Sequence, residues 1–297
     1  IKTDPRNEEE VVEHVESAIQ SRKQIAKLDE LGSDFSSEKF SNVASEGVHQ
    51  LLFKQDLDRA KVEFIQGEID DLILEEYGIT ETVEQMYENL PSNLSKLPHV
   101  KRADKDHKKD GVPVVELSDS EFEEKLSIIS DSDETALRAL SEKAGLSPIA
   151  VAQLRYEYEL YEDDELEQAG GDILSFLLGS IFGRWDTDLS ETSDEILAFS
   201  SSNIGKGDEL IKRGIESLFT EPRQARNQLE DILGKTPKDW LLDDFFRYHH
   251  CKEYRRRGQR IPIYWQLESR NGAFSCVIYY HGIDSDTLPK LRGQYLD

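Results

Sequence analysis

The sequence predicts a mainly α-helical protein, built of helical domains with a small β-hairpin near the C-terminus. Over most of its 297 residues, apolar side chains recur at three- and four-residue intervals, a spacing that places them on one side of a helix. Residues 260–281 differ, because β-branched and aromatic residues there flank the pair Asn271-Gly272. Asn-Gly suits the positive φ angles of a tight turn, so this region predicts two paired strands.

The first half of the sequence predicts long amphipathic helices. Apolar spacing indicates one helix over residues 8–31 and a second over 40–65, interrupted near Gly47. Glu68–Tyr77 predicts a separate short helix that ends at Gly78. The opposite sides of these helices carry Glu, Lys, Gln and Asp, so we expect them to pack on each other or on partners.

Residues 91–111 are rich in Ser, Asn, Pro, Lys and Asp, a composition typical of a linker or mobile loop. The basic run Lys101–Lys109 has two interpretations, a solvated loop of mixed charge or a local contact for phosphate. A short strand is predicted over residues 112–117, and two acidic helices follow it up to Gly145.

A new helix is predicted to open at Pro148, since proline is tolerated in the first turn of a helix. The most hydrophobic helix is predicted over Asp172–Trp185. Ser175, Gly179 and Gly183 recur there at four-residue intervals and predict a groove of small side chains. Such a groove lets another backbone approach closely; the alternative is a ligand groove.

A Ser-rich connection is predicted over residues 199–203. The Gly-x-Gly of residues 204–208 follows no predicted strand and lacks a complete phosphate-loop motif, so we predict a flexible loop and then a helix capped by Asp208. A further helix is predicted to stop at Gly234, and another to start at Thr236 and continue towards the hairpin.

These elements suggest three regions. Residues 1–98 form a helical region, 99–165 a linker with a small helical segment, and 166–297 a helical domain with the C-terminal β-hairpin. The length suffices for two or three modest domains. The first residue is Ile rather than Met, so we expect the sequence to be a piece of a longer protein.

The composition is strongly acidic, with a formal net charge of -25 and a pI near 4.7. Such an excess of carboxylate argues, taken alone, against general binding of polyanions. Acidic residues spread over the whole length are also typical of a protein from a salt-loving organism, where charges are screened within a few ångströms. Under that interpretation the net charge carries little information about DNA.

Cysteine use and hydropathy indicate the compartment. Cys251 and Cys276 fall in a predicted helix end and a predicted strand, so we expect no disulfide framework and a reducing environment. The longest apolar run, Ile173–Phe182, is too short and too interrupted to span a bilayer, and no signal peptide is visible. We therefore expect a cytoplasmic protein with no membrane partner.

Four arginines within six residues enter the first strand of the predicted hairpin. One interpretation is that they neutralise phosphates of a nucleic acid; the other is a solvated helix end whose cations complement the helix dipole and nearby carboxylates. Tyr264 and Trp265, which follow, are interpreted as core residues rather than as platforms for bases. The predicted DNA-binding residues are Lys252, Arg255, Arg256, Arg257 and Arg260.

Several motifs of this sequence have a counterpart in a known family. The runs Arg260–Trp265, Ile278–His281 and Asp286–Leu296, together with Asp172–Trp185 and the shorter Ile69–Thr80, occur in a family-like order. They resemble the region downstream of the catalytic domain in large adenine-specific DNA methyltransferases, namely the phage-defence enzymes of BREX systems and the related type IIG restriction-modification enzymes. The resemblance covers residues 166–297 and, in the first half, only the short motif.

The resemblance implies that the chain is the non-catalytic DNA-recognition and helical region of an adenine-N6 DNA methyltransferase. It would clamp or read duplex DNA while a methyltransferase domain outside this chain, using S-adenosylmethionine, flips and modifies an adenine. The alternative is an acidic helical scaffold that docks other defence-system proteins and touches no DNA.

The 297 residues contain neither the glycine-bearing turn for S-adenosylmethionine nor the Asn-Pro-Pro-aromatic loop of that family. We therefore predict no catalytic and no cofactor-binding residue here, and expect S-adenosylmethionine only in the full-length protein. No metal site is predicted either. Adjacent residues of a helix, as in His249-His250-Cys251, point about 100° apart, and no second Cys/His pair lies at zinc-finger spacing.

Overall fold

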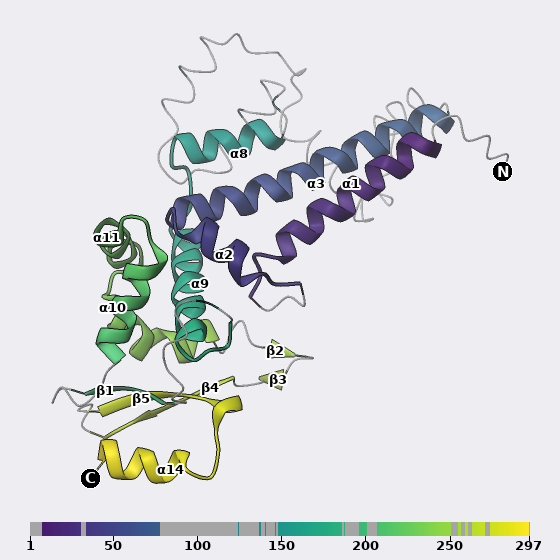
Figure 1. Ribbon diagram of the computed structural model, residues 1–297. Helices are drawn as coiled ribbons and strands as arrows, with labels where there is room; N and C mark the ends of the chain where they lie inside the picture. Colours follow the sequence, from purple (N-terminus) through teal and green to yellow (C-terminus); the bar gives the residue numbers. More distant parts are fainter. Residues whose placement is uncertain are drawn as a thin grey trace, which may run out of the picture. The chain divides into compact units, whose positions relative to one another are not determined.

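The computed structural model describes residues 8–30, 34–77, 124, 137, 140, 146, 148–185, 187, 196–200, 207–250, 255–256, 259–260, 263–270 and 274–296. Within these residues the chain is mainly helical and has a small antiparallel sheet near its C-terminus (Figure 1). The predicted fold class is therefore confirmed. The chain divides into two compact units, one of Ile1–Gln24 with Asp56–Leu160 and one of Ile25–Gln55 with Tyr161–Asp297.

The first unit contains most of two long helices, α1 (Glu8–Ala26) up to Gln24 and α3 (Val48–Tyr77) from Asp56 onward. It also contains α8 (Pro148–Glu157). The start of α8 is as predicted. The separate helix predicted over residues 68–77 is wrong, because α3 continues to Tyr77. A single exposed glycine, Gly67, lies in α3 before that segment; one glycine costs a helix only about 1 kcal/mol and does not end it.

A small core holds part of the first unit together. Leu137, Leu140 and Leu160 are buried and pack with the half-buried Val151 and Leu154. Beside them Arg155 of α8 forms an ion pair with Asp56 of α3, and its Nε donates to the carbonyl oxygen of Leu160 at 3.3 Å. The strand predicted over residues 112–117 and the basic run 101–109 lie outside the described residues.

The central helix of the second unit is α9 (Asp163–Ile181). It starts nine residues earlier than predicted, because the acidic turn at its beginning favours a helix N-terminus: the N–H of Glu162 donates to Glu165 Oε2 at 3.0 Å. The helix ends before Gly183, whose φ of 66° is left-handed. The N–H groups of Gly183 and Arg184 then donate to the carbonyl oxygens of Ser180 and Gly179 at 2.9 and 2.8 Å. Gly183 therefore terminates the helix and is not part of the predicted groove.

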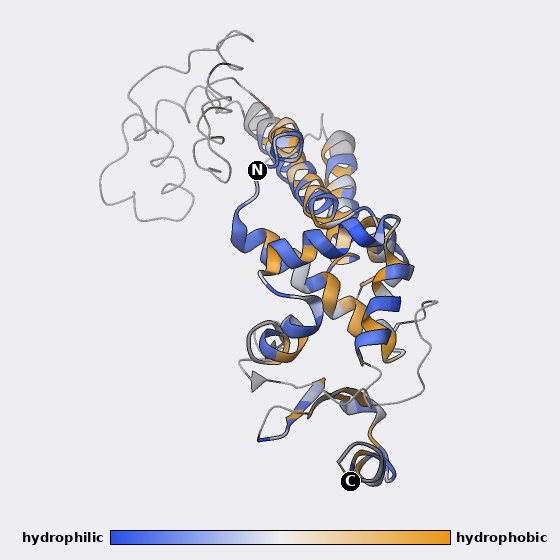
Figure 2. Cartoon of the chain, turned by 90° about the vertical axis from the view of Figure 1, so that its left-hand side faces the viewer, coloured by the Kyte–Doolittle hydropathy of each residue, from blue (hydrophilic) through white to orange (hydrophobic). Residues whose placement is uncertain are grey.

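Helices surround α9 in this unit. They are α2 (Ser37–Ala44), α10 (Gly207–Leu218), α11 (Pro222–Leu233) and α12 (Pro237–Trp240), which continues into the π-helical segment η2 (Leu241–His250). The predicted stop at Gly234 and start at Thr236 are confirmed: Gly234 has a φ of 63°, and the Thr236 hydroxyl accepts from the N–H of Asp239 at 3.1 Å. Figure 2 shows the resulting two-sided helices, with hydrophilic outer surfaces and hydrophobic inner ones. The largest fully buried side chains of this core include Phe40, Phe176, Leu229, Phe245 and Tyr264.

The sheet has three antiparallel strands in the order β1 (Ile196–Ser200), β5 (Phe274–Tyr279), β4 (Tyr264–Glu268). The predicted hairpin is confirmed as β4 and β5, with Trp265 opposite Ile278. Strand β1 was not predicted, since Phe199 and Ser200 belong to the predicted Ser-rich connection. Instead, β1 pairs along β5 with Ile196 opposite Ile278.

Both faces of strands β1 and β5 are covered. On one face Leu197, Phe199, Val277 and Tyr264 belong to the helical core. On the other, Leu291 packs against Ile196, Ala198, Cys276 and Ile278. Leu291 begins the π-helical segment η4 (Leu291–Leu296), which follows α14 (Thr287–Lys290). Burial on this side raises the pKa of the Cys276 thiol to about 12. A strand buried on both faces has no polar alternation, which explains why β1 is a continuous apolar run.

Candidate nucleic-acid interface

Three of the five predicted DNA-binding residues lie in a two-stranded ladder formed by β2 (Arg255–Arg256) and β3 (Gln259–Arg260). Arg255 is opposite Arg260, and Arg256 is opposite Gln259. We call β2 and β3 the arginine ladder. Directly opposed residues of an antiparallel pair have Cα atoms about 4.5–5.5 Å apart, so two of the predicted cationic residues are close neighbours. Lys252 and Arg257 lie outside the described residues.

The arginine ladder is separate from the main sheet. The sequence predicts the arginines at the entrance of the first hairpin strand, whereas β4 begins only at Tyr264. Arg260 and Ile263 are three residues apart, which limits the distance between them to about 11 Å. The ladder is therefore tied closely to the beginning of β4.

Tyr264 anchors that beginning in the core. Its side chain is fully buried, and its ring centroid lies 5.5 Å from that of Phe245 and 5.8 Å from those of Phe182 and Tyr279. Burial raises the pKa of the Tyr264 hydroxyl well above its usual range. The interpretation of Tyr264 as a core residue is confirmed.

A buried ion pair contributes to this environment. Arg184, just after α9, forms an ion pair with Glu30, and both side chains are almost buried. Glu30 adds to the rise in the pKa of Tyr264, while Arg184 acts in the opposite direction. The guanidinium of Arg184 also lies over the ring of Trp185, 4.2 Å from its centroid. The start of β4 thus packs into the buried part of the helical frame.

Trp265 does not belong to the core, and its assignment there is wrong. Its side chain is 44% exposed and lies beside Tyr280, which is 47% exposed, with the two ring centroids 5.7 Å apart. The ring of His281 lies 5.4 Å from that of Tyr280 at an interplanar angle of 78°. We call Trp265, Tyr280 and His281 the aromatic cluster. Exposed rings of this kind offer flat apolar surface on which bases can stack.

The aromatic cluster lies near the arginine ladder. The N–H of Tyr280 donates to the carbonyl oxygen of Ile263 at 2.8 Å, and Ile263 is the third residue after the ladder. Strand alternation was the signal that could have identified the cluster. Tyr264 and Trp265 are consecutive in β4 and point to opposite faces, so both cannot enter the same core.

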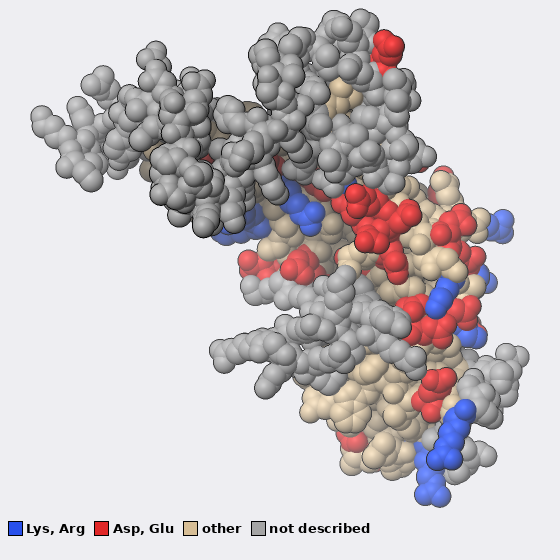
Figure 3. Space-filling model, turned by 180° about the vertical axis from the view of Figure 1, so that it is seen from behind, with Lys and Arg blue, Asp and Glu red and all other residues tan. Residues whose placement is uncertain are grey.

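The described surface carries much negative charge. Acidic side chains gather in patches on the face shown in Figure 3. In the described part of the chain, no group of three or more His, Cys, Asp or Glu side chains is placed to hold a metal ion. None of the described helices combines the length and the apolarity that a membrane span requires.

Comparison with known proteins relates the chain to the adenine-specific methyltransferases of BREX systems. It is 26% identical over 155 residues to adenine-specific methyltransferase PglX of Lacticaseibacillus casei (strain Zhang), an alignment that covers 41% of this chain. It is 29% identical over 89 residues to adenine-specific methyltransferase BrxX of Escherichia coli O9:H4 (strain HS), covering 30% of this chain. These partial homologies confirm the resemblance found from the motifs.

The chain spans only 13% of the length of PglX and 7% of that of BrxX. No family model matches the chain, and no solved structure matches it.

Proposed function

We propose that this chain is the non-catalytic DNA-recognition region of an adenine-N6 DNA methyltransferase of a phage-defence system. Lys252, Arg255, Arg256, Arg257 and Arg260 contact the phosphates of duplex DNA. The observation that carries the proposal is the pairing of Arg255 with Arg260 in a ladder close to the exposed aromatic cluster. The partial homologies to PglX and BrxX support the choice of DNA as the ligand.

The two features have different tasks in this proposal. Arginine side chains neutralise phosphates and fix the register on the duplex without reading its sequence. Trp265 and Tyr280 supply stacking surface for a base or a sugar at the edge of the contact. The net charge of -25 repels DNA elsewhere, so binding is confined to the place where cations concentrate.

Catalysis lies outside this chain in the proposal. A methyltransferase domain elsewhere in the full-length protein binds S-adenosylmethionine and modifies the flipped adenine, in the cytoplasm where the DNA is. The helical frame holds the arginine ladder in position beside that domain and offers surface to other defence-system proteins.

The test is duplex-DNA affinity as a function of salt, measured on the 297-residue chain. The variant R255Q/R256Q/R257Q/R260Q removes four cations. If each contacts one phosphate, the slope of log K against log salt becomes shallower by about 3.6. The matched control R22Q/K23Q/R59Q/R213Q removes four exposed cations of α1, α3 and α10 and is expected to keep the slope.

Trp265→Ala tests the second feature. Loss of one stacked base costs about 1–3 kcal/mol of binding free energy and leaves the salt slope unchanged, because no cation is removed. If the wild type shows no salt-dependent affinity for DNA, or if the control variant loses as much as the arginine variant, the proposal fails. The acidic scaffold is then the better description, as the acidic surface patches would favour.

A further inference from the structure

The second unit contains a hollow of about 690 Å³ between α10, α11 and the start of α12. Its floor is apolar. Ile211 and Ile215 of α10 line it and are only 3% and 4% exposed, and the buried Pro237 of α12 closes one side. A volume of this size is within the range of sites for small molecules, about 300–1,000 Å³.

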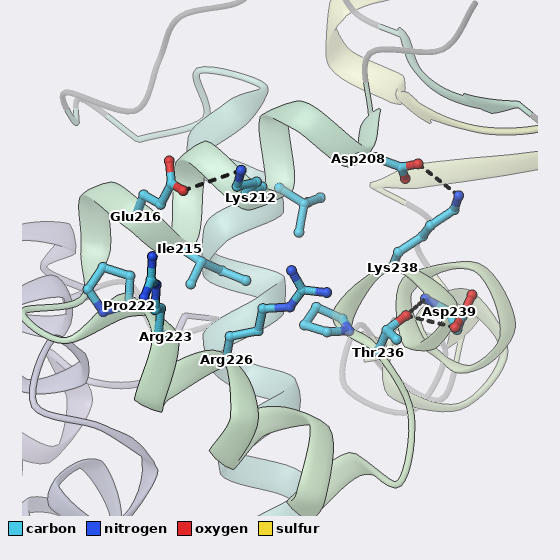
Figure 4. Close-up of a pocket in the computed structure, with 12 residues that line it drawn as sticks. Asp208, Lys212, Ile215, Glu216, Pro222, Arg223, Arg226, Thr236, Lys238 and Asp239 are labelled. Atoms are coloured by element: carbon cyan, nitrogen blue, oxygen red, sulfur yellow. Dashed lines mark hydrogen bonds and ion pairs between the residues drawn. The ribbon is translucent and has the colours of Figure 1, made fainter. Parts of the chain in front are cut away.

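Two arginines of α11 line the hollow. Arg223 and Arg226 are three residues apart, which places them on the same side of the helix, and Figure 4 shows their guanidinium groups beside the apolar floor. Arg226 uses Nε to donate to Glu230 Oε1 at 2.8 Å. The side chain of Arg223 forms neither a hydrogen bond nor an ion pair with any residue in the described part of the chain. A guanidinium offers several donors in a planar fork that matches an oxyanion.

The rim of the hollow is charged but nearly balanced. Its lining includes the cations Lys212, Arg223, Arg226 and Lys238, and the acids Asp208, Glu216 and Asp239. The lysines are already paired, Lys238 with Asp208 at 2.8 Å and Lys212 with Glu216 at 3.7 Å. Four cations against three acids give the lining a charge of +1, and Glu230, which pairs with Arg226 from outside the lining, offsets it.

The number of cations in the hollow, and their balance with nearby acids, indicate how large an anionic ligand it can bind. A protein that follows duplex DNA commonly neutralises about 6–10 phosphates, whereas this hollow has four cations, of which Lys212, Arg226 and Lys238 already pair with carboxylates. A small ligand with a single anionic group matches both the charge and the volume. Its apolar part then lies on Ile211 and Ile215, while its anionic group meets the two arginines.

We propose that this hollow binds a small organic phosphate ester, with Arg223 and Arg226 holding the phosphate and the apolar floor holding the organic part. This site is separate from the arginine ladder and does not depend on the proposed contact with DNA. It gives the chain a ligand that no part of the DNA-recognition proposal requires.

The test is a calorimetric or NMR titration of the 297-residue chain with AMP and phenyl phosphate, and with adenosine, phenol and inorganic phosphate as partial ligands. We expect both esters to bind about tenfold more tightly than their uncharged counterparts, as charge-assisted hydrogen bonds predict. Arg223→Gln and Arg226→Gln should each weaken the esters about tenfold. The control Arg22→Gln, on α1 outside this unit, should have no effect.

A charge change in the opposite direction separates binding from a merely structural effect. Asp208→Asn releases Lys238 from its ion pair and raises the charge of the lining, so affinity for the esters should increase about threefold. Esters that bind no better than adenosine and phenol, or unchanged affinity in Arg223→Gln, would overturn the proposal. Inorganic phosphate binding as tightly as the esters would also overturn it, because the apolar floor would then have no role.

Discussion

Gly179 of α9 lies where three parts of the second unit meet. A Cβ atom at this position would be 2.7 Å from Trp185 Nε1 and 3.2 Å from the hydroxyl oxygen of Tyr264. The small residues of α9 predict close packing along one side of the helix, and for Gly179 this prediction is correct. The contact is made by two side chains rather than by another backbone. Spacing along one helix cannot distinguish these cases, because Trp185 and Tyr264 reach Gly179 through the tertiary fold.

Gly179→Ala is therefore expected to destabilise the protein by about 1–3 kcal/mol, the usual cost of overpacking. The matched control is Gly214→Ala in α10, where the new Cβ would be 3.4 Å from Leu177 and 3.8 Å from Ile181, ordinary contact distances. There the loss of a helix glycine should stabilise by about 0.5–1 kcal/mol. Denaturant unfolding followed by tryptophan fluorescence measures both changes. Equal effects of the two substitutions would show that the contact at Gly179 is unimportant.

At the scale of elements, the helices and the hairpin were the most predictable parts. Thr236 and Gly234 mark helix ends by local hydrogen bonding and local backbone conformation, so their positions could be inferred from a few neighbouring residues. Strand β1 was not inferred, since its partner β5 lies about eighty residues later in the sequence. A short apolar run contains no information about which distant strand it joins.

Phe199→Ala tests whether β1 is a structural strand. Phe199 is 3% exposed and belongs to the helical core, so its truncation should cost about 3–5 kcal/mol of unfolding free energy. Phe64→Ala in α3 is the control, because Phe64 is 41% exposed and its loss should cost less than about 1 kcal/mol. Thermal or denaturant unfolding gives both values. If Phe199→Ala is as mild as the control, Phe199 behaves as part of the Ser-rich connection predicted over residues 199–203.

At the scale of the whole molecule, the dominant property is the net charge of -25. Like charges repel each other and destabilise the compact state, and salt reduces this repulsion because the Debye length falls from about 10 Å at 0.1 M to about 3 Å at 1 M. The proposed origin in a salt-loving organism rests on this property. It is also compatible with the DNA-recognition proposal, since a screened acidic surface no longer opposes the approach of DNA.

We accordingly expect the Tm to rise by several degrees between 0.1 and 1 M KCl. The variant E13Q/E16Q/E63Q removes three exposed carboxylates of α1 and α3, which changes the formal net charge from -25 to -22. Its Tm should rise less over the same range, because less repulsion remains to be screened. Differential scanning calorimetry gives both curves. A Tm that is constant or falls with KCl would contradict the role assigned to the net charge.

Residue patterns were sufficient for the helical character, for several helix ends and for the β4–β5 hairpin, all of which depend on near neighbours along the chain. They also located the arginines and the order of motifs shared with the methyltransferases. They were wrong for the start of α9 and for the continuation of α3 to Tyr77. The pairing of β1, the contact between Trp265 and Tyr280, and the hollow between α10 and α11 came from the folded arrangement alone. Each of these brings together residues that are distant in sequence or on different elements, and periodicity within one element does not encode such contacts.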